Sequence, residues 1–197
     1  MPYDPNKHHR RSIRLKGYDY SQAGAYFVTM CAQQRELLFM TDDVIDMIQR
    51  WWDKLPEKFP GAETDAFVIM PNHAHGIIAV GVNPRVDPNP RVDPNPGQTH
   101  GSAPTVAPTL GGMIQWFKTM TTNEYIRGVK TLNWTPFPGK LWQRNYYEHV
   151  IRSEIELNAI RQYIINNPLK WAHDRDNPIK IRPAAETVAA YLSEAGL

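Results

Sequence analysis

The sequence predicts an α+β fold, and two observations carry this prediction. Strand-like and helix-like segments follow one another in the order strand, helix, strand, strand, helix, strand, helix. The second and third strands, at residues 63–70 and 73–80, are separated only by Pro71-Asn72, which favours a tight antiparallel connection. The chain of 197 residues is long enough for one domain with a substantial core.

Composition narrows the class of protein. Hydrophobic residues make up 42% of the chain and charged residues 21%, as in an ordinary globular domain. No apolar run approaches the roughly 20 residues that cross a bilayer, and the basic start lacks the apolar core of a signal peptide. The single cysteine, Cys31, excludes an internal disulfide and a cysteine-built zinc site. We therefore expect a cytoplasmic protein, and with a net charge of only +2 its partners must be inferred from local clusters.

The first strand and the first helix have clear local signals. Residues 26–32 are rich in β-branched and aromatic side chains, which predicts a buried strand. A helix is predicted to begin at Thr41, whose hydroxyl would cap it, with Asp42 and Asp43 at the positive end of its dipole. Apolar residues at helical spacing follow, and Pro56 is expected to end this helix.

Residues 81–109 differ in character from the rest of the chain. The hexamer Asn83-Pro-Arg-Val-Asp-Pro88 is repeated at residues 89–94, and proline can enter neither a helix interior nor a central strand. We predict a low-complexity insertion without chemistry of its own. The helical period returns at Leu110 with a stripe of apolar residues, which predicts the second helix.

Aromatic and basic side chains alternate from Trp134 to Arg152. Bases stack on aromatic rings while cations follow phosphates, and each stacked base contributes about 1–3 kcal/mol. The alternative is a strand at the edge of the core whose large side chains simply pack. The basic segment from Lys7 to Lys16 is open to two interpretations as well, either a solvated arm or a phosphate contact.

A last helix is predicted from the capping box Ser153-Glu-Ile-Glu156 to the stop at Asn166-Asn167-Pro168. Ile155 and Ile164 are expected to face the core. Tyr163 and Asn167 are four residues apart and would share a face, although Pro168 is expected to push Asn167 away from helical angles. Residues 184–197 could form a short peripheral helix.

His73 and His75 open the third strand. Side chains two apart on a strand point the same way, so two imidazoles would lie side by side at a spacing that suits one metal ion. Neutral imidazole is a common ligand for divalent metals. The alternative is a pair of half-buried histidines bonded to the backbone, and the pair alone favours that alternative.

The metal-site interpretation becomes the stronger one when four motifs are considered together. In chain order they are Pro71-Asn-His-Ala-His-Gly76, Leu141-Trp-Gln-Arg144, His149-Val-Ile-Arg152 and Tyr163-Ile-Ile-Asn-Asn-Pro168. The set resembles the HUH single-tyrosine transposases, specifically the REP-associated tyrosine transposases, over about residues 10–172. The proline-rich insertion departs from the family, and Ala74 stands where a bulkier hydrophobe is usual. The resemblance implies a central antiparallel sheet flanked by helices, related to the ferredoxin-like arrangement.

The resemblance also implies roles for single residues. Tyr163 would be the nucleophile, and His73, His75 and Asn167 would bind a divalent cation, Mg²⁺ or Mn²⁺. The implied protein cleaves and rejoins single-stranded DNA at hairpin-forming repeats through a 5′-phosphotyrosine link. It would be nucleoid-associated in the cytoplasm, as a monomer or homodimer without membrane contact. The predicted DNA contacts are Arg10, Arg11, Arg14, Lys16, Lys140, Trp142, Arg144, His149 and Arg152.

We accordingly divide the chain into a basic arm (1–24), a transposase domain (25–172, with the insertion at 81–109) and a tail (173–197).

Two other functions stay open. A catalytically idle hairpin-binding protein derived from a transposase would not need the intact histidines, Tyr163 and Asn167. An ordinary metallohydrolase is weakened because no obvious carboxylate base lies near the histidines. Tyr146 and Tyr147 are rival nucleophiles, but neither has a ligand-type residue one helical turn away.

Overall fold

The computed structural model describes residues 23–81, 109–174, 176–179 and 193. Its elements are β1 (Gly24–Cys31), η1 (Gln33–Arg35), α1 (Asp42–Asp53), α2 (Leu55–Lys58), β2 (Ala62–Met70), β3 (His73–Val80), α3 (Leu110–Thr131), β4 (Tyr147–Ile151), α4 (Glu154–Asn166) and η2 (Pro168–His173). The predicted order of strands and longer helices is therefore confirmed. Nearly all of the basic arm, of the proline-rich insertion and of the suggested helix at 184–197 lies outside the described residues.

The strands form one antiparallel sheet in the order β2-β3-β1-β4. The α+β prediction is confirmed, including the tight turn through Pro71 and Asn72 between β2 and β3. The central strands β1 and β3 place Thr29 opposite His75. On the other side of β1, Thr29 lies opposite Tyr147 of the edge strand β4.

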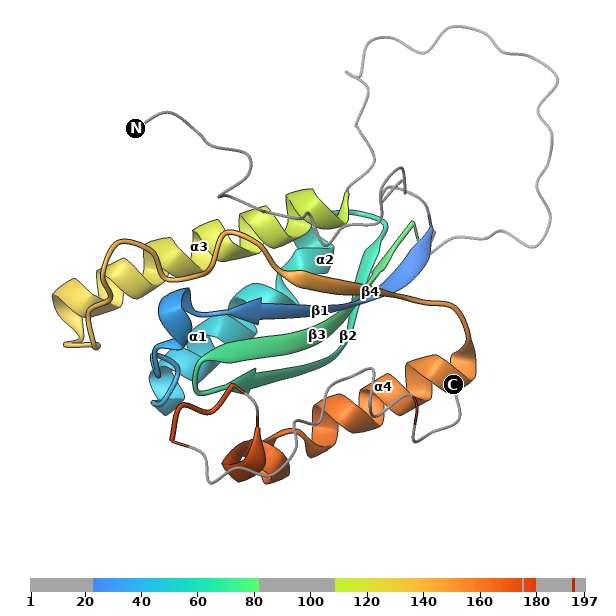
Figure 1. Ribbon diagram of the computed structural model, residues 1–197. Helices are drawn as coiled ribbons and strands as arrows, with labels where there is room; N and C mark the ends of the chain where they lie inside the picture. Colours follow the sequence, from blue (N-terminus) through green and yellow to red (C-terminus); the bar gives the residue numbers. More distant parts are fainter. Residues whose placement is uncertain (1–22, 82–108, 175, 180–192, 194–197) are drawn as a thin grey trace, which may run out of the picture.

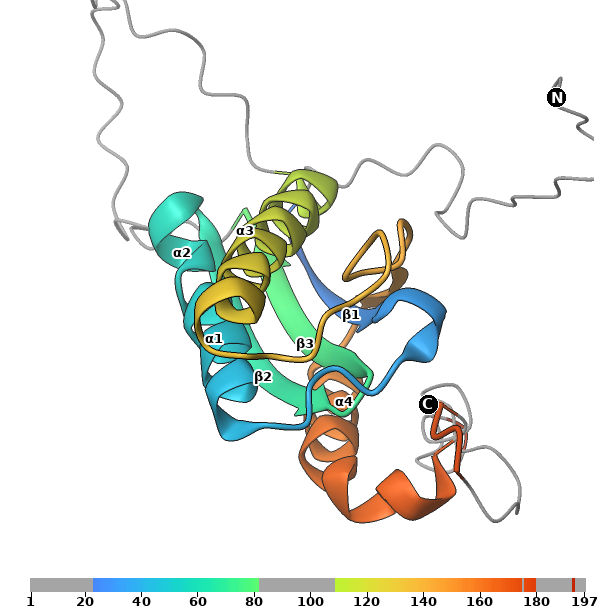
Figure 2. The same cartoon turned by 90° about the vertical axis from the view of Figure 1, so that its left-hand side faces the viewer.

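Helices cover the two faces of the sheet unequally (Figure 1, Figure 2). Helices α1 and α3 pack on one face, and α4 lies on the other. Because strand side chains alternate between faces, Tyr26 and Val28 belong to the cluster under α1 and α3, whereas Phe27 belongs to the cluster under α4. The cluster under α4 is the smaller one and consists of Phe27, Ile77, Ile151, Ile160, Tyr163 and Ile164.

Helix α1 begins after Thr41, as predicted, but its cap and its end differ from the prediction. Thr41 holds the N-cap position, but its side chain makes no capping hydrogen bond within the described part of the chain, and its carbonyl accepts the Val44 and Ile45 N–H groups. The helix ends at Asp53, and Pro56 lies in the first turn of α2. Proline is tolerated there because a first-turn N–H has no intrahelical partner to lose. The predicted capping hydroxyl and the predicted stop at Pro56 are therefore wrong.

Helix α4 begins as predicted, because Ser153 Oγ accepts the Glu156 N–H at 3.1 Å. Ile164 is buried, but Ile155 is 68% exposed. Nine residues at about 100° each place these two side chains on opposite sides of a helix, so they cannot both face the sheet. Asn167 keeps helical angles (φ −59°, ψ −42°), contrary to expectation, because the chain continues directly into η2.

No helix in the described part of the chain combines the length and the apolar character that a membrane-spanning segment requires.

Candidate functional site

Two histidines at the start of β3 meet on the α4 face of the sheet. His73 and His75 are two residues apart on an extended strand, so both side chains project to this face. Both residues are buried, and their Nε2 atoms lie 3.0 Å apart. Two ligands about 2.1 Å from one ion and at right angles would themselves be about 3.0 Å apart, so the spacing suits a single divalent cation.

The outer nitrogen of His73 has a partner that determines its protonation. His73 Nδ1 lies 2.8 Å from Asn72 Oδ1, while the Asn72 amide nitrogen donates to the carbonyls of Arg35 and Asp176, at 3.1 and 2.6 Å. An amide oxygen can only accept, so His73 carries its proton on Nδ1. Its Nε2 therefore presents a lone pair toward His75, which is the form that binds a metal.

His75 has a more adaptable partner. Its Nδ1 lies 2.8 Å from the Thr29 hydroxyl, which can donate or accept and so suits either neutral tautomer. Burial, followed by the charge of His73, holds the pKa of His75 well below its ordinary value. Phe27 stacks on the imidazole with 5.4 Å between ring centroids. The surroundings thus keep His75 neutral and fix its ring, as a ligand site requires.

Tyr163 of α4 reaches the same place from the helix above the sheet. Its ring lies 5.4 Å from that of His75 and 5.9 Å from that of Phe27, centroid to centroid. The residue is 8% exposed, and Ile160 and Ile164 on the same helix are buried beside it. The structure therefore brings the predicted nucleophile and the predicted histidine pair together.

Asn167 lies one helical turn beyond Tyr163. It is 4% exposed, and among the described residues its buried Oδ1 has no hydrogen-bond partner. Tyr163, one helical turn before Asn167, contacts His75. Trp171 of η2 places its ring 6.0 Å from that of His73. The chain therefore approaches the histidine pair on both sides of Asn167 in the sequence. A buried amide oxygen without a partner costs about 1–3 kcal/mol. A cation bound beside the histidines would remove this cost, so the residues present fit a divalent metal.

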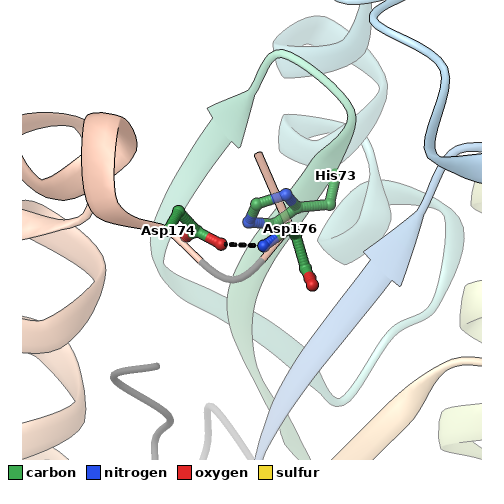
Figure 3. Close-up of side chains that lie close together, drawn as sticks. All are labelled: His73, Asp174 and Asp176. Atoms are coloured by element: carbon green, nitrogen blue, oxygen red, sulfur yellow. Dashed lines mark hydrogen bonds between the residues drawn. The ribbon is translucent and has the colours of Figure 1, made fainter. Parts of the chain in front are cut away.

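Two carboxylates from the segment after η2 lie next to His73 (Figure 3). One ligand-type atom each of His73, Asp174 and Asp176 lies within 4.8 Å of the others, and this group could hold a metal ion. Asp174 Oδ1 accepts the backbone N–H of Asp176 at 2.6 Å, and the Asp176 carboxylate pairs with the Arg35 guanidinium. The expectation that no carboxylate lies near the histidines is wrong, because η2 carries the chain back to the β2–β3 turn.

Sequence reasoning missed Thr29, Arg35 and Asp174. Thr29 is a polar residue within a strand of large apolar side chains, and this contrast is a usable signal. Arg35 and Asp174 offer no such signal, because charged residues in short connections are ordinarily solvated.

The predicted DNA contacts separate into groups. Arg10, Arg11, Arg14 and Lys16 lie outside the described residues. Three cations in the segment before β4 or directly after it are exposed and accessible to a polyanion: Lys140, Arg144 and Arg152.

Trp142 and His149 are engaged within the fold. Trp142 is buried, donates from Nε1 to Thr121 Oγ1 at 2.8 Å and packs against Phe39, so its ring cannot stack on a base. The predicted DNA contact of Trp142 is wrong, and the packing alternative holds for it. His149 Nε2 lies 2.6 Å from Glu156 Oε1, which ties β4 to the first turn of α4.

The rival tyrosines differ in position. Tyr147 is 40% exposed on the α4 face, with its ring 6.3 Å from that of Phe27, and burial raises the pKa of its phenol. Tyr146 packs toward the opposite face, where Lys118 Nζ lies 5.6 Å from its ring centroid.

Comparisons with known proteins point in one direction. No family model matches the sequence. An uncharacterized protein of Haemophilus influenzae is 35% identical over 181 residues, which cover 88% of this chain and 96% of the relative. A second Haemophilus influenzae protein, provisionally named a REP-associated tyrosine transposase, is 26% identical over 158 residues, which cover 79% of this chain and 76% of the relative.

A solved structure agrees at the level of the fold. The structure of a REP-associated tyrosine transposase bound to a REP hairpin is similar with a TM-score of 0.51 and 20% identity. The similarity covers 80% of this chain and 74% of that chain. At this level of sequence identity the similarity supports a shared fold and nothing more. That fold is the four-stranded antiparallel sheet with flanking helices described above.

Proposed function

The chain belongs to one family with its 35% identical relative and is a relative of the REP-associated tyrosine transposases, and from this premise we propose a DNA strand-transfer activity. The proposed protein cleaves and rejoins single-stranded DNA beside a hairpin-forming repeat. Tyr163 forms a 5′-phosphotyrosine link with the cleaved strand. The observation that carries the proposal is the packing of the Tyr163 ring on His75, within a site built for neutral imidazoles.

A divalent cation, Mg²⁺ or Mn²⁺, would be held by His73 Nε2, His75 Nε2 and Asn167 Oδ1. When bound, it would polarise the scissile phosphate and offset the negative charge that repels a nucleophile. The support for these three ligands is the 3.0 Å between the Nε2 atoms and the buried Asn167 oxygen without a partner among the described residues. Asn72 and Thr29 hold the outer nitrogens and so orient both imidazoles.

In the proposed step, the Tyr163 phenolic oxygen attacks phosphorus. The Tyr163 O–P bond forms as the bond from phosphorus to the 3′-oxygen of the preceding nucleotide breaks. The phenol loses its proton, and the departing oxygen gains one to become a free 3′-hydroxyl. The number of phosphoester bonds is conserved, so a 3′-hydroxyl can reverse the step and rejoin strands without ATP. Phe27 meets the Tyr163 ring edge-on and limits its motion.

The exposed cations Lys140, Arg144 and Arg152 are the proposed phosphate contacts among the described residues. Lys140 and Arg144 precede β4 and Arg152 directly follows it, and its partner strand β1 carries Thr29 beside the histidine pair. Phosphate contacts act on paired and unpaired strands alike, so these cations position the DNA without selecting its form.

The test is incubation of the protein with a labelled hairpin that has a single-stranded flank, in Mn²⁺, followed by a denaturing gel. We expect a covalent protein–DNA adduct that Tyr163→Phe abolishes, because only the phenolic oxygen is removed. Hairpin binding, measured by fluorescence anisotropy, should stay nearly unchanged. Tyr147→Phe is the matched control on the same face and should keep the adduct.

Three results would contradict the proposal. An adduct that persists in Tyr163→Phe but disappears in Tyr147→Phe would move the nucleophile. Cleavage without any adduct would favour a metallohydrolase. Tight hairpin binding with neither cleavage nor adduct in the unmodified chain would favour a catalytically idle DNA-hairpin-binding protein.

A further inference from the structure

We propose that Asp174 supplies a carboxylate ligand to the cation held by the histidine pair. This inference rests on the proposed function, because it concerns the same ion. The ligand set would then be two imidazole nitrogens, one amide oxygen and one carboxylate oxygen. The carboxylate comes from the connection that follows η2, beyond the four motifs that identify the site in the sequence.

The first observation is the position of the carboxylate. One ligand-type atom of Asp174 lies within 4.8 Å of such atoms on His73 and on Asp176 (Figure 3). Ligands of one ion lie within about twice the metal–ligand distance of each other, or about 4–5 Å for an ion with bonds of 2.0–2.6 Å. The spacing therefore allows His73 and Asp174 to share an ion.

The second observation is independent of the acidic residues. Asn167 is 4% exposed, and its Oδ1 has no hydrogen-bond partner among the described residues. Tyr163, one helical turn before Asn167, has its ring 5.4 Å from that of His75, and Asn167 keeps helical angles, so its side chain shares the helix side that faces the histidines. A buried acceptor without a donor among the described residues is available to a cation, so the site rests on more than a meeting of surface acids.

Asp174 is a better candidate for the metal ligand than Asp176 because the two carboxylates make different contacts. The Asp176 carboxylate pairs with the Arg35 guanidinium, and its carbonyl accepts the Asn72 amide at 2.6 Å. These contacts anchor the segment to η1 and to the β2–β3 turn, respectively. Asp174 uses Oδ1 to accept the Asp176 N–H, and a carboxylate has a second oxygen that can bind an ion.

The charge of the ligand set gives the proposal a measurable consequence. Two neutral imidazoles and one amide carry no net charge, so they attract a divalent ion only through their dipoles. A carboxylate adds a full negative charge and a hard oxygen, which Mg²⁺ and Mn²⁺ prefer. Asp174→Asn removes this charge but keeps an oxygen that can accept the Asp176 N–H, so the segment should hold its shape.

The experiment measures Mn²⁺ binding directly, without DNA or turnover. Free Mn²⁺ is followed by electron paramagnetic resonance while the full chain is titrated. The proteins compared are the unmodified chain, Asp174→Asn, Asp176→Asn, His75→Ala and Asp46→Asn. We expect a loss of affinity of tenfold or more in Asp174→Asn and loss of binding in His75→Ala. Asp46, an exposed residue of α1, is the control for the same chemical change and should leave the affinity unchanged.

The outcomes separate the two proposals. Unchanged Mn²⁺ affinity in Asp174→Asn, with binding lost in His75→Ala, would overturn the role of Asp174 and leave the histidine site standing. A loss in Asp176→Asn but not in Asp174→Asn would equally overturn it. Absence of Mn²⁺ binding in the unmodified chain would overturn both. Melting temperatures without metal identify any variant that fails to fold.

Discussion

The two faces of the sheet are built from the same strands but carry different chemistry. The face under α1 and α3 is a large apolar cluster, in which Trp52 stacks on Phe67 with centroids 4.1 Å apart. The face under α4 has a smaller apolar cluster beside polar groups, of which His73 and His75 are buried and Thr29 is half-buried. Burial of apolar area supplies most of the folding free energy, so the first face mainly stabilises the fold, while the second carries the proposed site.

Strand β3 shows how one segment serves both purposes. Ala74 and Ile78 belong to the cluster under α1 and α3, whereas His73 and His75 project toward α4. Because neighbouring residues belong to different layers, substitutions one position apart should have separable effects on stability and on catalysis.

The largest expected effect is on the α4 face. His75→Ala should lower DNA cleavage by at least about 100-fold, because the ion loses a ligand while hairpin binding by surface cations persists. Gel assays of cleavage and anisotropy measurements of binding check this, and excess EDTA should reproduce the loss in the unmodified chain. Full cleavage in EDTA would contradict a metal-dependent step.

The next effect is on the opposite face, one residue away. A Cβ added at Gly76 would lie 2.5 Å from the Trp52 ring and 2.8 Å from Phe67 Cδ2. These two rings stack on each other, so both would have to shift to accommodate it. Gly76→Ala should therefore lower the free energy of unfolding by about 1–3 kcal/mol. Chemical denaturation measures the change, and cleavage per folded molecule should remain.

Gly112→Ala is the matched control. Its Cβ would meet only Thr109 Oγ1 at 3.3 Å, at the start of α3, where alanine has the better helix propensity. A loss of stability in this control as large as that in Gly76→Ala would refute the packing explanation.

The smallest effect concerns Lys118, a half-buried lysine of α3. Burial lowers the pKa of Lys118 to about 8, although its Nζ donates to the carbonyls of Gln143 and Asn145 at 2.9 and 3.0 Å. The unfolded chain keeps an ordinary lysine pKa near 10.4, so it binds more protons than the folded chain between about pH 8 and 10. The free energy of unfolding should rise over this window by up to about 2 kcal/mol.

Lys118→Met keeps the apolar stem but removes the charge, so its stability should lack this rise. Denaturation of both proteins at pH 8 and pH 10 gives the difference, in which the other titrating groups cancel. Identical pH profiles for the two proteins would show that Lys118 does not change its protonation on folding.

Much of the fold could be predicted from the sequence because its signals are local. The strand that begins at His73, the capping box at Ser153 and the turn at Pro71-Asn72 each depend on residues within one or two turns of chain. Backbone geometry turns such periodicities into helices and strands with little help from distant residues. The same locality explains the errors at Pro56 and Asn167, where the following segment decides whether helical geometry continues.

By itself, the sequence determined which residue types could do chemistry: a histidine pair on one strand face, and a tyrosine and an asparagine one helical turn apart. Only the tertiary structure decided which oxygen holds each imidazole, that Trp142 is a core residue, and that Asp174 lies beside His73. The physical reason is that strand alternation and helical spacing act over a few residues. The approach of Thr29, Asp174 and His73 depends instead on how the whole chain packs around one sheet.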